Sequence, residues 1–166
     1  MSLARSAPLA ALVALALPGC GGGAAAAAGP TFTVGAITFR VGSTGVERGA
    51  GEATFWLTDQ PDTCQAIVGT PVQATTFFEL TAAPAASGAT AATVVPTKLA
   101  PAPGEAIGQL SRRTGGHLDA VELAVSGTVT WIVAADGRHL LDAFDVGFAG
   151  TTDRLVGGGL ALATCR

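Results

Sequence analysis

The sequence predicts an all-β domain, an antiparallel, meander-like sandwich or small barrel of about eight strands with one short helix. Many short runs alternate between apolar and polar residues, and glycine, proline or aspartate separates them. No long stretch has the spacing of an amphipathic helix. The strongest hairpin signal is Asp136-Gly137, which stands between two alternating runs near the C-terminus.

The first two predicted strands cover residues 31–34 and 37–41. Apolar residues occupy even positions in the first run and odd positions in the second. Because successive strand residues point to opposite faces, this change of parity predicts a β-bulge at Gly35. Residues 53–58 alternate again and form the next predicted strand.

A turn and a short helix are expected after this strand. Asp62 follows the turn-forming residues 59–61 and is predicted to cap a helix that runs to Val68 and ends at Gly69. Residues 72–81 are apolar and β-branched enough for a further strand.

The middle of the chain is predicted to alternate between loops and strands. Residues 82–93 are a low-complexity Ala/Thr/Pro run and are expected to form an exposed loop. A short strand at 94–95 and a second loop at 96–103 follow. Residues 106–113 are predicted to form a strand that ends in the turn Gly115-Gly116.

Three strands are expected in the C-terminal part. Residues 125–133 place Trp131 on the apolar face, and 140–148 return after the Asp136-Gly137 turn. The last strand covers 154–165. The glycines at 157–159 within it predict a strong bend or a close backbone contact.

The N-terminus has the features of an exported protein. Arg5 precedes an apolar run at 7–17 that is too short to span a bilayer. The sequence Leu17-Pro18-Gly19-Cys20 then resembles the lipobox of bacterial lipoproteins. Residues 1–19 are therefore expected to be a signal peptide and Cys20 the lipidated N-terminus. The alternative is an ordinary secretory signal with a chance cysteine at its end.

The lipobox resemblance implies a diacylglyceryl group on the Cys20 thiol and a further acyl chain, such as palmitate, on its amine. More than one chain makes membrane anchoring stable. Residues 20–30 are rich in glycine and alanine and are expected to act as a flexible tether to a β-rich domain at 31–166. Gly21 after the lipidated cysteine resembles outer-membrane sorting in a cell with two membranes, so the expected location is the cell envelope.

Two further cysteines, Cys64 and Cys165, are expected to form a disulfide. Exported proteins meet an oxidising compartment in which such a pair oxidises. The two residues are about a hundred positions apart, so the bond would stabilise the fold by roughly 4–5 kcal/mol. A metal site and a reactive thiol are the alternatives, although no further cysteine or histidine has suitable spacing.

Composition argues against several function classes. The net charge is −3, and Arg112-Arg113 is the only adjacent basic pair, so nucleic acid is not an expected partner. The glycines at 157–159 lack the G-K-[ST] of a phosphate loop, and no serine lies in a G-x-S-x-G elbow. No enzyme activity and no cofactor are therefore expected.

A few residues remain as candidates for ligand contact. Asp142 shares parity with apolar residues of its strand, and a carboxylate there either pairs with an arginine or marks a pocket. Trp56 shares parity with threonines and is a candidate for an exposed stacking surface. His117 and Asp119 would share a face and need a third metal ligand such as His139 or Asp142. Solvated turn positions are the simpler interpretation.

The C-terminal region resembles a family. The segments Ser126-Gly-Thr-Val-Thr130, Ala143-Phe-Asp-Val-Gly-Phe148 and Asp153-Arg-Leu-Val-Gly157, with the closing Cys165, are similar to a recurrent pattern in uncharacterised β-rich lipoproteins of GC-rich Gram-negative bacteria. This resemblance implies a β-rich fold and a disulfide, and it implies no particular function.

Together these features predict a lipid-anchored protein of the cell envelope. Its expected role is structural or the binding of an envelope protein or the cell wall, with the membrane as its other partner through the N-terminal lipid. A small-ligand or glycan-binding β domain, using the barrel interior or Trp56, is the alternative, and a hydrolase is the third.

Overall fold

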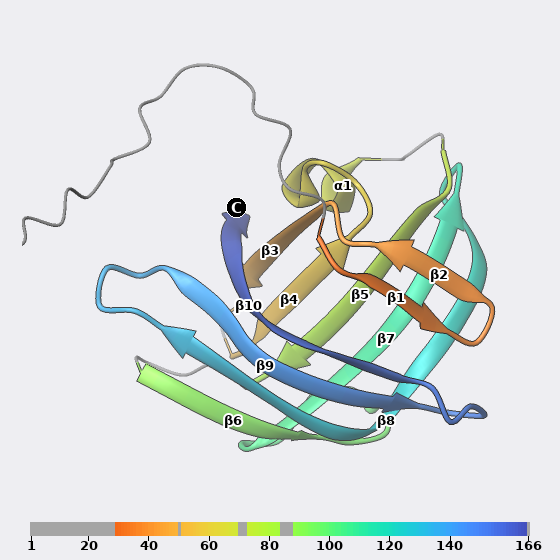
Figure 1. Ribbon diagram of the computed structural model, residues 1–166. Coiled ribbons are helices and arrows are strands. Elements are labelled where there is room, and N and C mark those ends of the chain that lie inside the picture. The colour runs from red at the N-terminus through yellow and green to blue at the C-terminus, as the bar shows by residue number, and fades with distance from the viewer. Residues whose placement is uncertain (1–28, 50, 70–72, 84–87, 166) are drawn as a thin grey trace, which may run out of the picture.

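The fold is an eight-stranded closed β-barrel with a separate two-stranded sheet and one short helix (Figure 1). The computed structural model describes residues 29–49, 51–69, 73–83 and 88–165; the predicted signal peptide, Cys20 and most of the predicted tether lie outside the described residues. The elements are β1 (Thr31–Val34), β2 (Ile37–Arg40), β3 (Ser43–Arg48), β4 (Ala53–Thr58), α1 (Thr63–Val68), β5 (Thr75–Ala82), β6 (Gly88–Val94), β7 (Glu105–Thr114), β8 (His117–Val133), β9 (His139–Phe148) and β10 (Arg154–Cys165). The all-β prediction is confirmed, and of the two expected architectures the barrel is the correct one.

The strands follow each other around the barrel in the order β10-β3-β4-β5-β7-β6-β8-β9. Most neighbours are antiparallel, as expected. Two pairs are parallel: β10 with β3, and β6 with β7. The parallel contact between Ala163–Cys165 and Gly45–Glu47 closes the barrel, because it joins the last strand to the first strand of the barrel wall.

Two expectations for the middle of the chain are corrected. Much of the run at 82–93, predicted as a loop, belongs to β6, where Ala92 and Val94 are buried and β8 supplies an antiparallel partner. Strand β8 begins at His117 rather than near 125, and β7 pairs with its first half. In both places the small or polar residues form strands because neighbouring strands complete their hydrogen bonds.

Aromatic rings fill the barrel interior. Phe55 and Trp131 have ring centroids 5.3 Å apart, and Phe78 lies 6.3 Å from both Phe144 and Phe148. These rings come from four strands, and their alternation with outward residues follows the pleat of each strand. The prediction that Trp131 packs in the core is confirmed.

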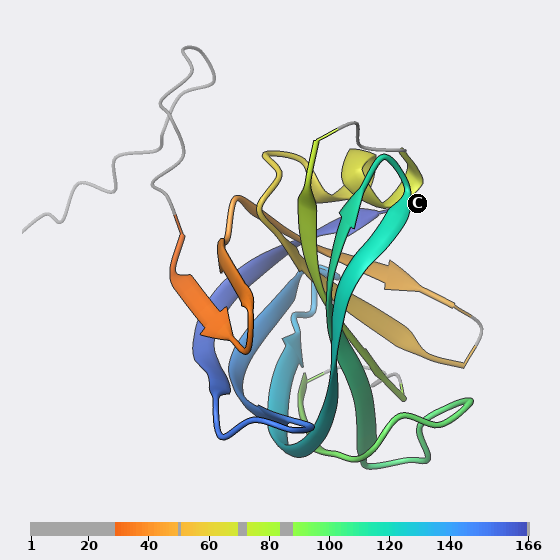
Figure 2. The same cartoon turned by 90° about the vertical axis from the view of Figure 1, so that its right-hand side faces the viewer.

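Strands β1 and β2 form a hairpin that packs beside the barrel wall (Figures 1 and 2). The predicted bulge at Gly35 is wrong: Gly35 has a φ of 55° and begins the tight turn between the two strands. Its N–H donates to the Asp153 carboxylate at 2.9 Å. Phe32 reaches the core ring of Phe144 at 6.0 Å, so the apolar face of the hairpin joins the barrel core.

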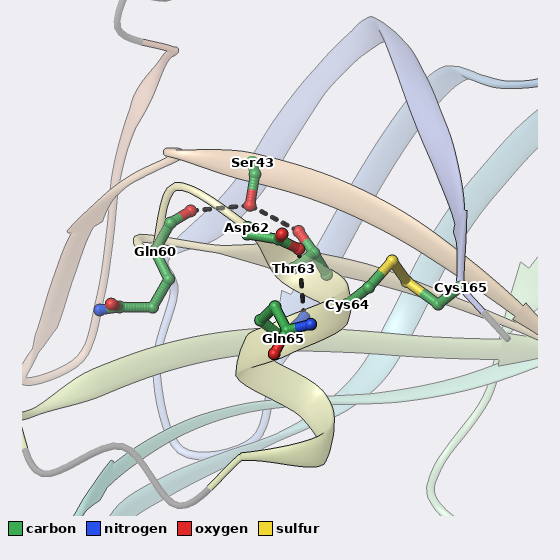
Figure 3. The surroundings of a disulfide bond; sticks show 7 residues. All are labelled: Ser43, Gln60, Asp62, Thr63, Cys64, Gln65 and Cys165. Atoms are coloured by element: carbon green, nitrogen blue, oxygen red, sulfur yellow. Dashed lines mark hydrogen bonds between the residues drawn. A yellow bond between two sulfur atoms is a disulfide. The ribbon is translucent and has the colours of Figure 1, made fainter.

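Helix α1 begins and ends as predicted, and Cys64 on it is bonded to Cys165 (Figure 3). The Asp62 carboxylate accepts the Gln65 N–H at 3.1 Å, which caps the helix. The Cα atoms of the two cysteines are 5.2 Å apart. The predicted disulfide is confirmed, and it fastens the helix to the end of β10.

Two features of β3 let the helix lie close to it. The Ser43 hydroxyl donates to the Gln60 carbonyl at 2.7 Å, so the Thr63 hydroxyl is the donor in its 2.7 Å bond with Ser43 (Figure 3). A Cβ on Gly45 would lie 2.9 Å from Thr63 Cγ2 and 3.0 Å from Cys165 Sγ. Glycine is therefore the residue that leaves room for the disulfide over β3.

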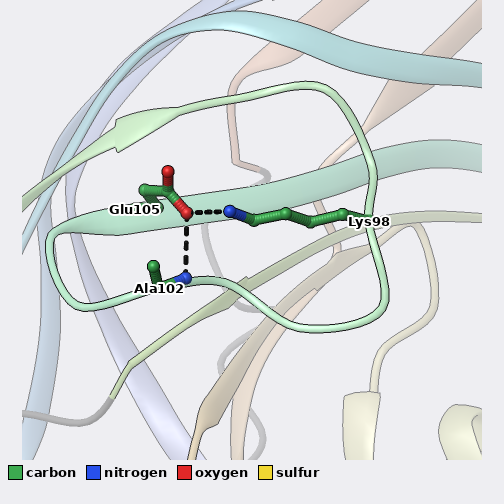
Figure 4. Close-up of polar contacts among 3 residues, drawn as sticks. All are labelled: Lys98, Ala102 and Glu105. Carbon is green, nitrogen blue, oxygen red and sulfur yellow. Dashed lines mark hydrogen bonds and ion pairs between the residues drawn. The ribbon is translucent and has the colours of Figure 1, made fainter.

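The loop from β6 to β7 is held at its end by Glu105. The Glu105 carboxylate accepts from the Lys98 ammonium and, at 2.9 Å, from the Ala102 N–H (Figure 4). These two donors hold the pKa of Glu105 below its ordinary value. The contacts fold the long connection back so that β7 can start beside β6 in the parallel direction.

The pairing of β8, β9 and β10 contains bulges that change the parity of their residues. Thr130 pairs with Ala143 while Trp131 pairs with Leu141, so Asp142 is the extra residue of β9. The prediction that Asp142 shares the apolar face of Phe144 is therefore wrong, and its side chain is exposed. On β10 a Cβ at Gly158 would lie 2.0 Å from the Asp142 carbonyl oxygen, which confirms the expected close backbone contact at 157–159.

Candidate functional site

The strands β4, β5, β7 and β8 present a continuous outer face. Their register places four outward residues side by side, one on each strand: Trp56, Glu79, Gln109 and Leu123. The adjacent row contains Phe77, Ser111 and Val121. We call this surface the outer face.

A cleft lies where α1 meets the outer face. Its side-chain walls are Trp56, Phe77 and Arg113 from the strands and Ala66 and Ile67 from the helix. Its remaining lining is Gly69 and Gly116. The cleft has a volume of about 90 Å³. Figure 2 shows α1 and the β7–β8 turn at the same end of the barrel. We call this hollow the α1 cleft.

Arg113 brings a positive charge to the α1 cleft, and the Phe77 ring lies beneath it. The Arg113 guanidinium lies over the Phe77 ring, 5.6 Å from its centroid. Trp56 meets the same ring edge-on at a centroid distance of 6.1 Å. Arg113 is in none of the salt bridges found among the described residues, and Trp56 Nε1 is buried there without an acceptor.

An apolar strip on β8 continues the outer face beyond the cleft. Leu118 is 58% exposed, and Val121 and Leu123 are each 41% exposed. Leu118 pairs with Arg113 across the β7–β8 ladder, so the strip starts beside the cleft. Neighbouring exposed apolar side chains on a rigid strand are typical of a contact surface.

The structure places the sequence-predicted candidates in different surroundings. Trp56 lies half-buried in the α1 cleft, whereas Asp142 is exposed on β9 and is not part of that lining. His117 and Asp119 are exposed, and the Asp119 carboxylate accepts a 2.6 Å hydrogen bond from the Thr114 hydroxyl. Within the described residues no three Asp, Glu, His or Cys side chains gather as metal ligands.

His139 is the buried histidine of the barrel. Only 4% of its surface is exposed, its neighbours across the ladders are Val133 and Leu162, and Nδ1 has no partner among the described residues. Burial, and secondarily the Arg48 charge, lower the pKa of His139 below its ordinary value. The neutral imidazole is thus the form that the folded protein favours.

Sequence reasoning missed Phe77 and Arg113 as parts of a site. Two consecutive phenylalanines in a strand point to opposite faces, so the pair at 77–78 already signals an outward aromatic ring. Arg113 carried no such signal, because its position over Phe77 depends on the pairing of β5 with β7.

Comparisons with protein-family models, with curated proteins and with solved structures find no match for this chain. In the described part of the chain no helix is long and apolar enough to cross a membrane.

Proposed function

We propose that the protein is a lipid-anchored component of the cell envelope that binds an envelope protein or the cell wall through its outer face. The observation that carries this proposal is the exposure of Leu118, Val121 and Leu123 on one side of β8. Leaving neighbouring large apolar side chains in water is unfavourable, and a partner that covers them would remove that cost.

The anchor half of the proposal is supported by the sequence alone. The lipobox-like residues 17–20 precede a Gly/Ala-rich stretch, and the first strand begins at Thr31. A fully extended stretch from 20 to 30 would reach roughly 40 Å at most. The domain would therefore work close to the membrane that holds its lipid.

The filled barrel favours a surface site over an internal ligand site. The rings of Phe55, Phe78 and Trp131 occupy the space where a small-ligand barrel would hold its ligand. A glycan ring on Trp56 is also disfavoured, because Trp56 is half-buried edge-on against Phe77. The described residues offer no observation in favour of a hydrolase.

Membrane fractionation tests the anchor. Cys20→Ala removes the lipid attachment site, and we expect the protein to move from the membrane fraction to the soluble fraction. Continued membrane association of this variant would contradict lipid anchoring.

Cross-linking in intact envelopes tests the outer face. We expect a discrete cross-linked partner that is lost when Leu118, Val121 and Leu123 are all changed to serine. The matched control is Val156→Ser, because Val156 is also 58% exposed but lies on β10. The same cross-link in the triple variant, or equal loss in the control, would reject the outer face as the contact surface.

A further inference from the structure

We propose that the α1 cleft binds a carboxylate carried by a small apolar group, such as the C-terminus of a peptide that ends in alanine. This inference deepens the proposed function, on which it rests, by naming the part of a partner that the cleft would hold. The charge, the apolar walls and the size of the cleft support this inference.

The charge of the cleft favours an anion. Arg113 brings a permanent positive charge and a planar fork of donors, which match the two oxygens of a carboxylate. The carboxylate on the neighbouring strand β5 is Glu79, and its Oε2 accepts from Gln109 Nε2 at 3.0 Å. Arg113 instead lies over Phe77 and is in none of the salt bridges found among the described residues.

Trp56 and Phe77 form an apolar wall beside Arg113. The Trp56 and Phe77 ring centroids are 6.1 Å apart, and the Arg113 guanidinium lies over the same Phe77 ring. Trp56 Nε1 is itself buried, so its N–H signal reports on a ligand in the cleft without bonding to it. A carboxylate is an acceptor-only group and could bond to the forked donors of Arg113 with its two oxygens.

Size and wall chemistry limit what carries the carboxylate. A volume of about 90 Å³ is smaller than the roughly 150 Å³ of a cavity that encloses a benzene ring. Ala66, Ile67 and Phe77 make the walls apolar. A carboxylate with a methyl-sized neighbour fits this space, whereas a sugar or aromatic ring does not.

The test is a titration of the ¹⁵N-labelled full lipoprotein in detergent micelles, followed by the two tryptophan indole N–H signals. The probe is N-acetyl-alanyl-alanine, and its matched control is the same dipeptide with a C-terminal amide. We expect the acid to shift the Trp56 signal, to leave the Trp131 signal in place, and to bind at least about tenfold more tightly than the amide. Trp56→Phe identifies the signal by removing it.

Arginine variants give a second, matched comparison. We expect Arg113→Gln to weaken binding of the acid about tenfold or more, and Arg112→Gln to leave it unchanged. Arg112 is the right control because it is the exposed neighbour with the same charge, and it does not line the cleft. The Trp131 signal reports whether each variant is folded; if Arg113→Gln fails to fold, the acid-against-amide comparison in the unchanged protein decides.

The outcomes separate this inference from the proposed function. Equal shifts with acid and amide, no shift with either, or equal effects of the two arginine variants would overturn the carboxylate site. If those results are found but the envelope cross-link is still lost in the triple serine variant, the proposed function stands and only the carboxylate site is rejected. If the acid binds selectively but no such cross-link is found, the carboxylate site stands and the outer face is rejected as the contact surface.

Discussion

Removal of the disulfide should destabilise the barrel strongly. The variant is Cys64→Ser with Cys165→Ser, made in a Cys20→Ala background so that no third thiol can exchange. The bond joins residues separated by 101 positions, and loop-closure entropy for that length corresponds to about 4–5 kcal/mol at 25 °C. Because small domains have a net stability of roughly 5–15 kcal/mol, this loss should lower the midpoint of thermal unfolding by on the order of 10 °C or more.

Guanidinium unfolding followed by tryptophan fluorescence measures this effect, since Trp131 is buried in the core. The dependence of the unfolding free energy on denaturant should become steeper, because an unfolded chain without the cross-link exposes more surface. A reducing agent should destabilise the parent protein to the level of the serine variant and leave that variant unchanged. A loss below about 1 kcal/mol, or two titratable thiols in the native parent, would show that this disulfide does not stabilise the barrel.

Two further predictions concern a glycine and a histidine. Gly127→Ala should cost more than about 2 kcal/mol, because its φ is 123° and its Cβ would lie 1.9 Å from the Asp145 carbonyl oxygen. Gly104→Ala, with a φ of 81° and open space around it, should cost only the backbone strain; equal losses in denaturant unfolding would contradict the steric argument. The folded state lowers the pKa of His139 through burial and then Arg48, so the unfolded chain takes up a proton first as pH falls. The contribution of His139 to the unfolding free energy should therefore be fully present above the ordinary pKa of about 6.5 and should decrease below it. His139→Leu should remove this part of the pH dependence. Identical pH profiles of the unfolding free energy in the two proteins would show that His139 does not contribute.

The local features of the fold could be predicted from the sequence. Period-two alternation predicted strands, and the Asp62 cap predicted the start of α1. Asp136-Gly137 predicted the turn before β9. These predictions succeed because a turn, a cap or the pleat of a strand depends on residues that are close together in the chain. The pairing of Cys64 with Cys165 was also expected from the sequence, because two cysteines remain once Cys20 is assigned to the predicted lipid attachment.

Long-range pairing sets which strands are neighbours and which side chains meet on the outer face. The parallel closure of β10 on β3 and the strand character of β6 depend on partners far away in the sequence. The bulge at Asp142 reversed a parity argument, because one extra residue moves a side chain to the other face. In the same way Phe77 and Arg113 come together only through the register of β5 with β7. Pairing between distant segments is a property of the whole barrel, and no local pattern contains it.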